Sequence, residues 1–194
     1  MKKISYAQTV YGKKEVNAVI KCLHESTQMG KYSTEFEKKI ANLFSKKNCL
    51  YVNSGTSALY IGIESFNFPK GSEIITPALT FGTTVASILK NNLVPVFIDV
   101  EPHTYCVDVK LIEKAISSKT VAILAPNLMG NICDWPKIKK IANKYKIPII
   151  EDTAWGCGGY YDEKPLGTYG EMGTFSFDFA KTMTTGEGGM ITFH

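Results

Sequence analysis

Short runs of apolar and β-branched residues alternate along the chain with segments in which apolar positions recur every three or four residues. The short runs have the length of buried β-strands, since a strand covered on both faces carries apolar side chains at successive positions. We therefore expect seven strands. They are predicted at Cys49–Val52, Glu73–Thr76, Val94–Asp99, Val121–Pro126, Ile147–Glu151, Met172–Phe177 and Met190–Phe193.

The segments between these runs have the pattern of amphipathic helices. In the segment 35–44, Phe36, Ile40 and Phe44 fall on one face of a helix. Asp134 and Pro136 stand where an N-cap and a first-turn proline favour a helix start. Helices are predicted at Lys13–Glu25, Glu35–Phe44, Ser57–Asn67, Phe81–Asn91, Val109–Ser117 and Asp134–Tyr145.

Alternation of strands and helices predicts an α/β fold. Parallel strands joined by right-handed crossovers place helices on both faces of the sheet, which gives three α/β/α layers around a mostly parallel seven-stranded sheet. A length of 194 residues suits one domain. We assign residues 1–194 to it, with residues 1–30 as an N-terminal helical segment.

Composition narrows the classes of function. The net charge is only +4, and the lysines are spread along the chain, which argues against a nucleic-acid partner. No run of eighteen apolar residues occurs, so we expect no membrane span and a cytoplasmic protein. The five cysteines form no Cys-x-x-Cys pair. We therefore expect reduced thiols and no metal site.

Ligands of such sheets bind at the carboxyl ends of the strands, and the turn after the first strand is a candidate for phosphate binding. There the segment 53–59 runs from a polar turn into a helix, whose free N–H groups can hold a phosphate. The alternative is an ordinary turn with Ser54 or Thr56 as N-cap. Neither a dinucleotide fingerprint nor a nucleoside-triphosphate loop occurs there.

Two acidic residues, Glu151 and Asp152, end another strand. A buried carboxylate needs a cationic partner, and a protonated pyridine nitrogen is such a partner, as in pyridoxal phosphate. The alternative for Asp152 is a turn cap. Phe81, which follows the second strand, is interpreted either as a ring that lies flat on a planar cofactor or as a core aromatic.

Lys181 follows the sixth predicted strand and precedes a glycine-rich segment. Desolvation lowers the pKa of a lysine and prepares its amine for Schiff-base chemistry. We expect this desolvation because Phe175, Phe177 and Phe179 lie nearby in the sequence and are poor neighbours for a solvated surface charge.

Together these segments resemble the DegT/DnrJ/EryC1/StrS family of pyridoxal-phosphate-dependent sugar aminotransferases, which share the aspartate-aminotransferase fold. The resemblance implies that Lys181 binds the cofactor as a Schiff base and shuttles protons, and that Asp152 pairs with the pyridine nitrogen. Phe81 would stack on the cofactor ring. The residues implied in phosphate binding are Gly55, Thr56 and Ser176. The resemblance covers Gly30-Lys31, Asn53–Leu59, Thr80–Ala86, Pro95–Pro102, Gly130-Asn131, Ile149–Gly159 and Gly173–Thr192.

The activity implied is transfer of an amino group from glutamate to a keto-sugar, usually nucleotide-linked, for surface polysaccharide or amino-sugar biosynthesis. A homodimer is implied too, in which the partner subunit completes the cofactor site. The sequence departs from the family pattern at Trp155, where Gln or His is common near the cofactor's phenolic oxygen. It departs again at Pro126-Asn127-Leu128-Met129, where a His and a Tyr often precede the glycine.

Family members continue into a smaller carboxyl-terminal domain, and we expect this chain to lack it. One alternative is therefore a non-catalytic remnant that serves as a dimerisation or binding module. A sugar dehydratase of the same fold is another, although that branch replaces the lysine by histidine, and Lys181 argues against it. A nicotinamide-dependent dehydrogenase is disfavoured because the glycine-rich fingerprint is missing.

Overall fold

A seven-stranded sheet forms the centre of the protein in the computed structural model, which describes residues 4, 10–25, 28 and 30–193. All seven predicted strands are present, in the order β1-β9-β8-β5-β4-β2-β3. Only β9 runs antiparallel to its neighbours β1 and β8, so the sheet is mostly parallel, as predicted. The strands are β1 (Asn48–Val52), β2 (Glu73–Pro77), β3 (Val94–Ile98), β4 (Thr120–Pro126), β5 (Ile149–Asp152), β8 (Met172–Ser176) and β9 (Gly189–Phe193).

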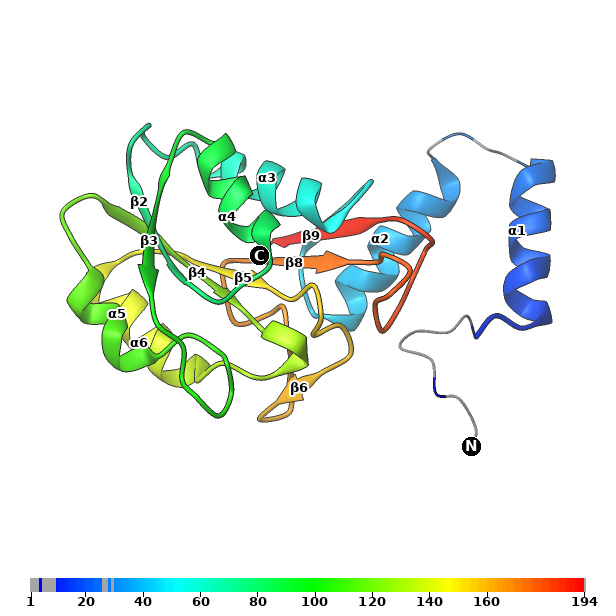
Figure 1. The fold of residues 1–194 in the computed structure, drawn as a ribbon. Coiled ribbons are helices and arrows are strands. Elements are labelled where there is room, and N and C mark those ends of the chain that lie inside the picture. Colours follow the sequence, from blue (N-terminus) through cyan, green and yellow to red (C-terminus); the bar gives the residue numbers. More distant parts are fainter. Residues whose placement is uncertain (1–3, 5–9, 26–27, 29, 194) are drawn as a thin grey trace.

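Helices cover both faces of this sheet and complete the predicted three layers (Figure 1). On one face, α3 (Gly55–Ser65) and α4 (Gly82–Lys90) pack on a core that includes Ile74 and Ile150. On the other face, α5 and α6 pack on Ile149, and α2 packs nearby on Phe175. These three helices are α2 (Lys31–Leu43), α5 (Val109–Ala115) and α6 (Trp135–Tyr145).

The pleat of β5 separates the two acidic residues at its end. Ile149 belongs to the core on the α5 and α6 side, and Ile150 belongs to the core on the α3 and α4 side. Because side chains alternate between the faces of a strand, Glu151 points with Ile149 and Asp152 points with Ile150. The two carboxyl groups therefore serve different faces of the sheet.

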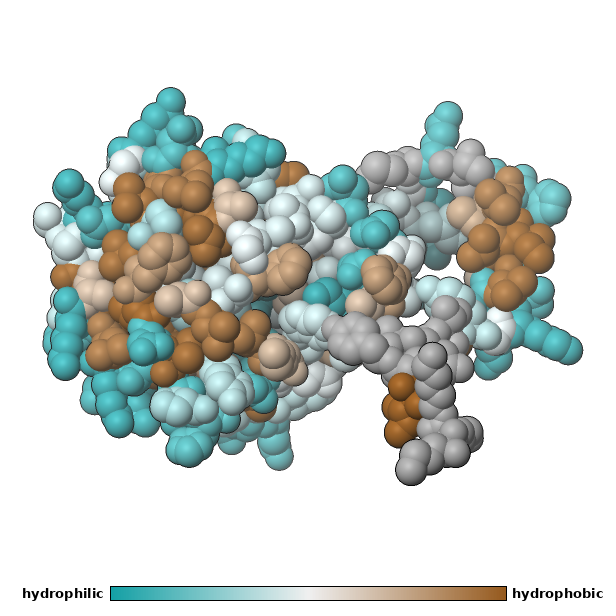
Figure 2. Space-filling model, in the orientation of Figure 1, coloured by the Kyte–Doolittle hydropathy of each residue, from teal (hydrophilic) through white to brown (hydrophobic). Residues whose placement is uncertain are grey.

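The N-terminal helix α1 (Lys13–Glu25) has the predicted bounds, and none of its residues is buried. Val16, Val19 and Leu23 are exposed on it and give the apolar surface seen over α1 in Figure 2. The predicted segment 1–30 is described only in part, because residues 1–3, 5–9, 26, 27 and 29 lie outside the described residues. The assignment of residues 1–194 to one domain stays a prediction.

Two short elements near the carboxyl ends of the strands were not predicted. A single 3-10 turn, η1 (Leu128–Gly130), follows β4, and a small hairpin of β6 (Tyr160–Tyr161) and β7 (Lys164–Pro165) follows β5. Both are too short to give a periodic pattern of apolar residues. In the described part of the chain, no helix combines the length and apolar character needed to cross a membrane.

Candidate active site

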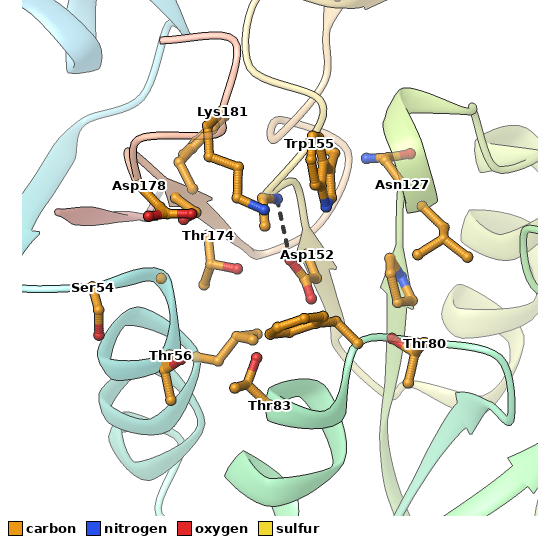
Figure 3. A pocket seen from close by; sticks show the side chains of 18 of the residues that line it. Ser54, Thr56, Thr80, Thr83, Asn127, Asp152, Trp155, Thr174, Asp178 and Lys181 are labelled. Atoms are coloured by element: carbon orange, nitrogen blue, oxygen red, sulfur yellow. Dashed lines mark hydrogen bonds between the residues drawn. The ribbon is translucent and has the colours of Figure 1, made fainter. Parts of the chain in front are cut away.

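A cavity of about 210 Å³ lies beyond the carboxyl ends of β4, β5 and β8, where the topology predicts a ligand site. Segments from six parts of the chain meet there, and every residue that the sequence analysis selected lines it. Figure 3 shows Lys181 and Asp152 pointing toward each other across the cavity, with Trp155 beside them. The selected residues are Gly55, Thr56, Phe81, Asp152, Trp155, Ser176 and Lys181.

Asp152 is a buried carboxyl group with a defined set of hydrogen bonds. The residue is only 6% exposed to solvent. The Thr84 hydroxyl donates to Oδ2 at 3.0 Å, and the backbone N–H of Ala154 donates to Oδ1 at 3.1 Å. Burial raises the pKa of this carboxyl above its usual value, against the lowering effects of Ala154, Thr84 and the Lys181 charge. Such a group favours a cationic ligand, because a nearby positive charge stabilises the ionised form.

Lys181 places its amine in the same cavity. The Nζ atom lies 3.7 Å from the centre of the Trp155 ring. Burial lowers the pKa of this lysine, and the negative charges of Asp178 and Asp152 oppose that change. The amine is therefore partly desolvated and has more neutral character than a surface lysine, which suits a nucleophile.

The source of this desolvation differs from the one expected. Phe175 and Phe177 are fully buried against α2 on the opposite face of the sheet, and Phe179 is 70% exposed. The phenylalanine pattern thus marks the pleat of β8, where alternate residues face the core. Trp155, which the sequence analysis placed near the cofactor and not near the lysine, is the aromatic group that contacts Lys181.

The turn before α3 is both a helix cap and part of the cavity. The Ser54 hydroxyl accepts a hydrogen bond from the N–H of Ser57 at 3.1 Å, so the ordinary N-cap alternative is correct for Ser54. The N–H groups of Gly55 and Thr56 precede the first helical hydrogen bond and have no acceptor within the helix. They line the cavity with Ser176 and are available to an anion.

Ser176 packs so closely on this turn that residue 55 has no room for a side chain. A Cβ atom at Gly55 would lie 2.8 Å from the Ser176 Cβ atom. The close approach brings the Ser176 hydroxyl beside the two N–H groups. Their common role in phosphate binding stays a prediction.

Glu151, the neighbour of Asp152, accepts a set of structural hydrogen bonds that was not predicted from the sequence. Its carboxylate accepts hydrogen bonds from Asn127 Nδ2 at 3.0 Å and from the N–H groups of Gly167, Tyr169 and Gly170 at 2.5, 2.8 and 3.4 Å. It thereby holds the segment before β8 to the end of β5. The alternation of side chains along a strand is the signal that distinguishes its role from that of Asp152.

The sequence analysis did not identify two residues that line the cavity, Asp178 and Thr174, or Thr84, which supports Asp152. Asp178 and Thr174 line the cavity, and the Thr174 hydroxyl is buried with no hydrogen-bond partner among the described residues. Thr84 lies behind the cavity and holds Asp152. Thr84 is one helical turn beyond Phe81, so extending the search along the helix face would have found it.

Gly189 allows the turn before α3 to lie close to the sheet, and Gly189→Ala is expected to disturb that turn. A Cβ atom there would lie 2.3 Å from the Ser54 carbonyl oxygen and 2.7 Å from the Gly55 nitrogen. Because these are backbone atoms, the turn must move, and overpacking of this kind costs about 1–3 kcal/mol. Urea denaturation should show that loss, and titration with pyridoxal phosphate should show weaker binding.

Gly82→Ala is the matched control for this variant. Gly82 opens α4 next to Phe81, and a Cβ atom there meets nothing within 4 Å. Stability and cofactor affinity should both stay at wild-type values. Equal effects of the two substitutions would show that loss of glycine, rather than contact with Ser54, is responsible.

Comparisons with known proteins agree with this site. The model of the DegT/DnrJ/EryC1/StrS aminotransferase family matches residues 10–194. The chain is 34% identical over 192 residues to GDP-perosamine synthase of Caulobacter vibrioides, which covers 98% of this chain and 52% of that protein. The resemblance inferred from the motifs is thus confirmed.

Solved structures show the same arrangement of the backbone. GDP-4-keto-6-deoxy-D-mannose-3-dehydratase of Escherichia coli with bound hydrated PLP (pyridoxal phosphate) superimposes with a TM-score of 0.93 at 31% identity, over 97% of this chain and 50% of that one. The aminotransferase from Psychrobacter cryohalolentis gives a TM-score of 0.90 at 30% identity, over 94% and 47%. The chain spans about half the length of these proteins. The family match extends over nearly all of the present chain, which therefore belongs to the DegT/DnrJ/EryC1/StrS aminotransferase family.

Proposed function

We propose that this chain forms the cofactor-binding part of a pyridoxal-phosphate-dependent aminotransferase that moves an amino group from glutamate to a keto-sugar, most simply a nucleotide-linked one. One observation carries the proposal: the partly desolvated amine of Lys181 and the buried carboxyl of Asp152 share one cavity. The relative named GDP-perosamine synthase supports a nucleotide-linked sugar as substrate. This activity places the protein in amino-sugar or surface polysaccharide biosynthesis.

The donor groups of the cavity fit such a cofactor. The N–H groups of Gly55 and Thr56 and the Ser176 hydroxyl are grouped where a phosphate needs donors. Asp152 offers a buried carboxylate, and a protonated pyridine nitrogen is the cation that would stabilise it. Phe81 lines the cavity with an exposed ring, which is 68% accessible and free to cover one face of a planar ligand.

Bound pyridoxal phosphate would supply an electron sink for the amino-transfer chemistry. Lys181 would hold it covalently through Nζ, and the same atom would take and return the proton in each half-reaction. Asp152 would keep the proton on the ring nitrogen. Trp155 covers Lys181 Nζ on one side and limits the access of water to it.

A sugar dehydratase is the second candidate, favoured by the structural similarity to the Escherichia coli enzyme. The dehydratase branch is expected to carry histidine at the position of Lys181. A lysine there could bind the cofactor covalently before the reaction and move the proton in each half-reaction, and this favours amino transfer. A cytoplasmic location and a homodimer stay predictions from the sequence.

Incubation of the chain with pyridoxal phosphate tests the proposal directly. A visible absorbance band should develop, and borohydride should then fix one cofactor to Lys181, which peptide mass spectrometry can locate. The attacking amine must be neutral, and burial lowers the pKa of Lys181 below its usual value of 10.5. The rate of capture should therefore rise with pH and reach half its maximum below pH 10.5.

The opposite results are equally clear. A folded chain that gives no band, or one in which borohydride fixes the cofactor to many surface lysines in similar amounts, would contradict the proposal and favour a non-catalytic binding module. Reaction with glutamate alone does not separate the two candidates, since a dehydratase of this fold has been solved with a trapped PLP-glutamate adduct. Appearance of the amino group of glutamate on the keto-sugar, with the sugar hydroxyls retained, would indicate an aminotransferase, whereas loss of a sugar hydroxyl would indicate a dehydratase.

A further inference from the structure

The start of α4 and the residues just before it carry a pair of hydrogen-bonded hydroxyl groups beside the cavity. Thr84 is fully buried, and its Oγ1 atom lies 3.0 Å from Asp152 Oδ2 and 3.0 Å from Thr80 Oγ1. Thr80 lines the cavity, whereas Thr84 does not. The three side chains form a hydrogen-bonded row from the cavity wall to the carboxyl group.

The ionisation of Asp152 determines which group donates and which accepts in each hydrogen bond of this row. An ionised carboxylate only accepts hydrogen bonds, so Thr84 must donate to Oδ2 and use its own oxygen to accept from Thr80. A protonated Asp152 would need an acceptor for its proton. Oδ1 already accepts a hydrogen bond from the N–H of Ala154. A proton on Oδ2 would therefore have to be donated to Thr84 Oγ1, and Thr84 would then have to donate to Thr80 instead of to Asp152.

Because Asp152 is buried, its hydrogen bonds have a large influence on whether its carboxyl group is ionised. Burial favours the neutral acid, and the hydrogen bonds of Thr84 and Ala154 favour the charged form. Ala154 comes two residues after Asp152 in the chain, so the local turn determines its hydrogen bond to the Asp152 carboxyl group. Thr84 belongs to another helix, and its contact alone ties the carboxyl group to α4.

We propose that Thr84 is a positioning residue that holds Asp152 as a carboxylate oriented for a cationic ring, and that Thr80 holds Thr84 in the donating direction. The same turn carries Phe81, so α4 places both the ring-covering residue and the support of the ring-nitrogen partner. This inference rests on the proposed function only in the choice of pyridoxal phosphate as the probe.

Thr84→Val tests this role with a side chain of nearly the same shape. Loss of a hydrogen bond to a charged group should weaken pyridoxal phosphate binding by about 10- to 150-fold, which corresponds to about 1.5–3 kcal/mol. Thr84→Ser keeps the hydroxyl and should restore affinity to near the wild-type value. Thr80→Val should weaken binding by a smaller factor than Thr84→Val.

A second measurement needs no cofactor. Infrared difference spectra of the cofactor-free chain against pH report the ionisation of Asp152, and the band is assigned by its loss in Asp152→Asn. Thr84→Val should move the midpoint upward by about one to two pH units, since the charged form loses its donor. Lys181 is the charged group that faces Asp152, and it is unchanged in all these variants.

Ser87→Ala is the matched control, because Ser87 is a buried hydroxyl on the same helix that donates to Thr83 O at 2.7 Å and makes no contact with Asp152. It should leave both measurements unchanged. Thr84→Val with wild-type affinity and wild-type ionisation of Asp152 would overturn the inference, as would a failure of Thr84→Ser to rescue. If wild-type chain captures no cofactor at Lys181, the proposed function fails, while the infrared measurement still decides the role of Thr84.

Discussion

Lys181→Ala should abolish covalent capture of pyridoxal phosphate altogether. The amine of Lys181 lies in the cavity beside Asp152, and no other lysine among the described residues lines that cavity. Without it, borohydride should fix no cofactor in the site. Transfer of the amino group of glutamate should fall by on the order of 10²–10⁴-fold or more, since the proton shuttle is also lost. Absorbance titration and mass spectrometry of the reduced protein provide the measurement.

Two other lysines show why position matters more than pKa here. Burial lowers the pKa of Lys46 to about 8, yet its amine donates to the Gly170 carbonyl and lies outside the cavity. Lys164 also has a pKa lowered by burial, but it is only partly buried, and its amine lies over the Tyr169 ring outside the cavity. Lys164→Ala is therefore the matched control and should capture cofactor like the wild type. Capture by Lys181→Ala at the wild-type rate would assign the nucleophile to another residue.

The sequence was sufficient to predict most of the fold because its strands are buried on both faces. Runs such as Val121–Pro126 and Met172–Phe177 are apolar at successive positions, which distinguishes them from the periodic helices between them. The observed β4 and β8 differ from these predictions by one residue at an end. The hairpin of β6 and β7 has strands of two residues, and a pattern that short carries no periodicity.

The site was predictable as far as strand ends determine it. Asp152 and Ser176 end parallel strands and meet at one edge of the sheet, as the topology requires. The contact of Lys181 with Trp155 joins two loops whose paths depend on tertiary packing, and no local pattern specifies it. The helix face shared with Phe81 could have identified Thr84 as a candidate, but its contact with Asp152 could not be predicted, since the two residues lie 68 positions apart in the sequence.

The helix α1 was predicted with its observed bounds, but its exposed apolar side was not predicted. Amphipathic spacing identified the helix, and Val16, Val19 and Leu23 are all more than half exposed along it. A helix of 13 residues has little stability by itself in water, so it depends on packing of its apolar face.

Asp152→Asn should weaken cofactor binding strongly without loss of stability in the cofactor-free chain. Asparagine has the same shape, and it can accept from Ala154 through Oδ1 while Nδ2 donates to Thr84. Removal of one member of a buried charge pair costs about 2–5 kcal/mol, which predicts pyridoxal phosphate binding on the order of 30- to 5,000-fold weaker. Asp134→Asn, which keeps a good N-cap on α6, is the control and should bind normally.

The stability of the same variant should change in the other direction. Burial raises the pKa of Asp152 in the folded state, so the folded chain binds more protons than the unfolded chain between the two pKa values. The free energy of unfolding of the wild type therefore falls as pH rises through that window, and Asp152→Asn should remove this fall. At neutral pH the cofactor-free variant should be at least as resistant to urea as the wild type. A variant that loses stability and affinity together would indicate that Asp152 supports the fold, whereas loss of affinity alone would identify a charge kept for its ligand.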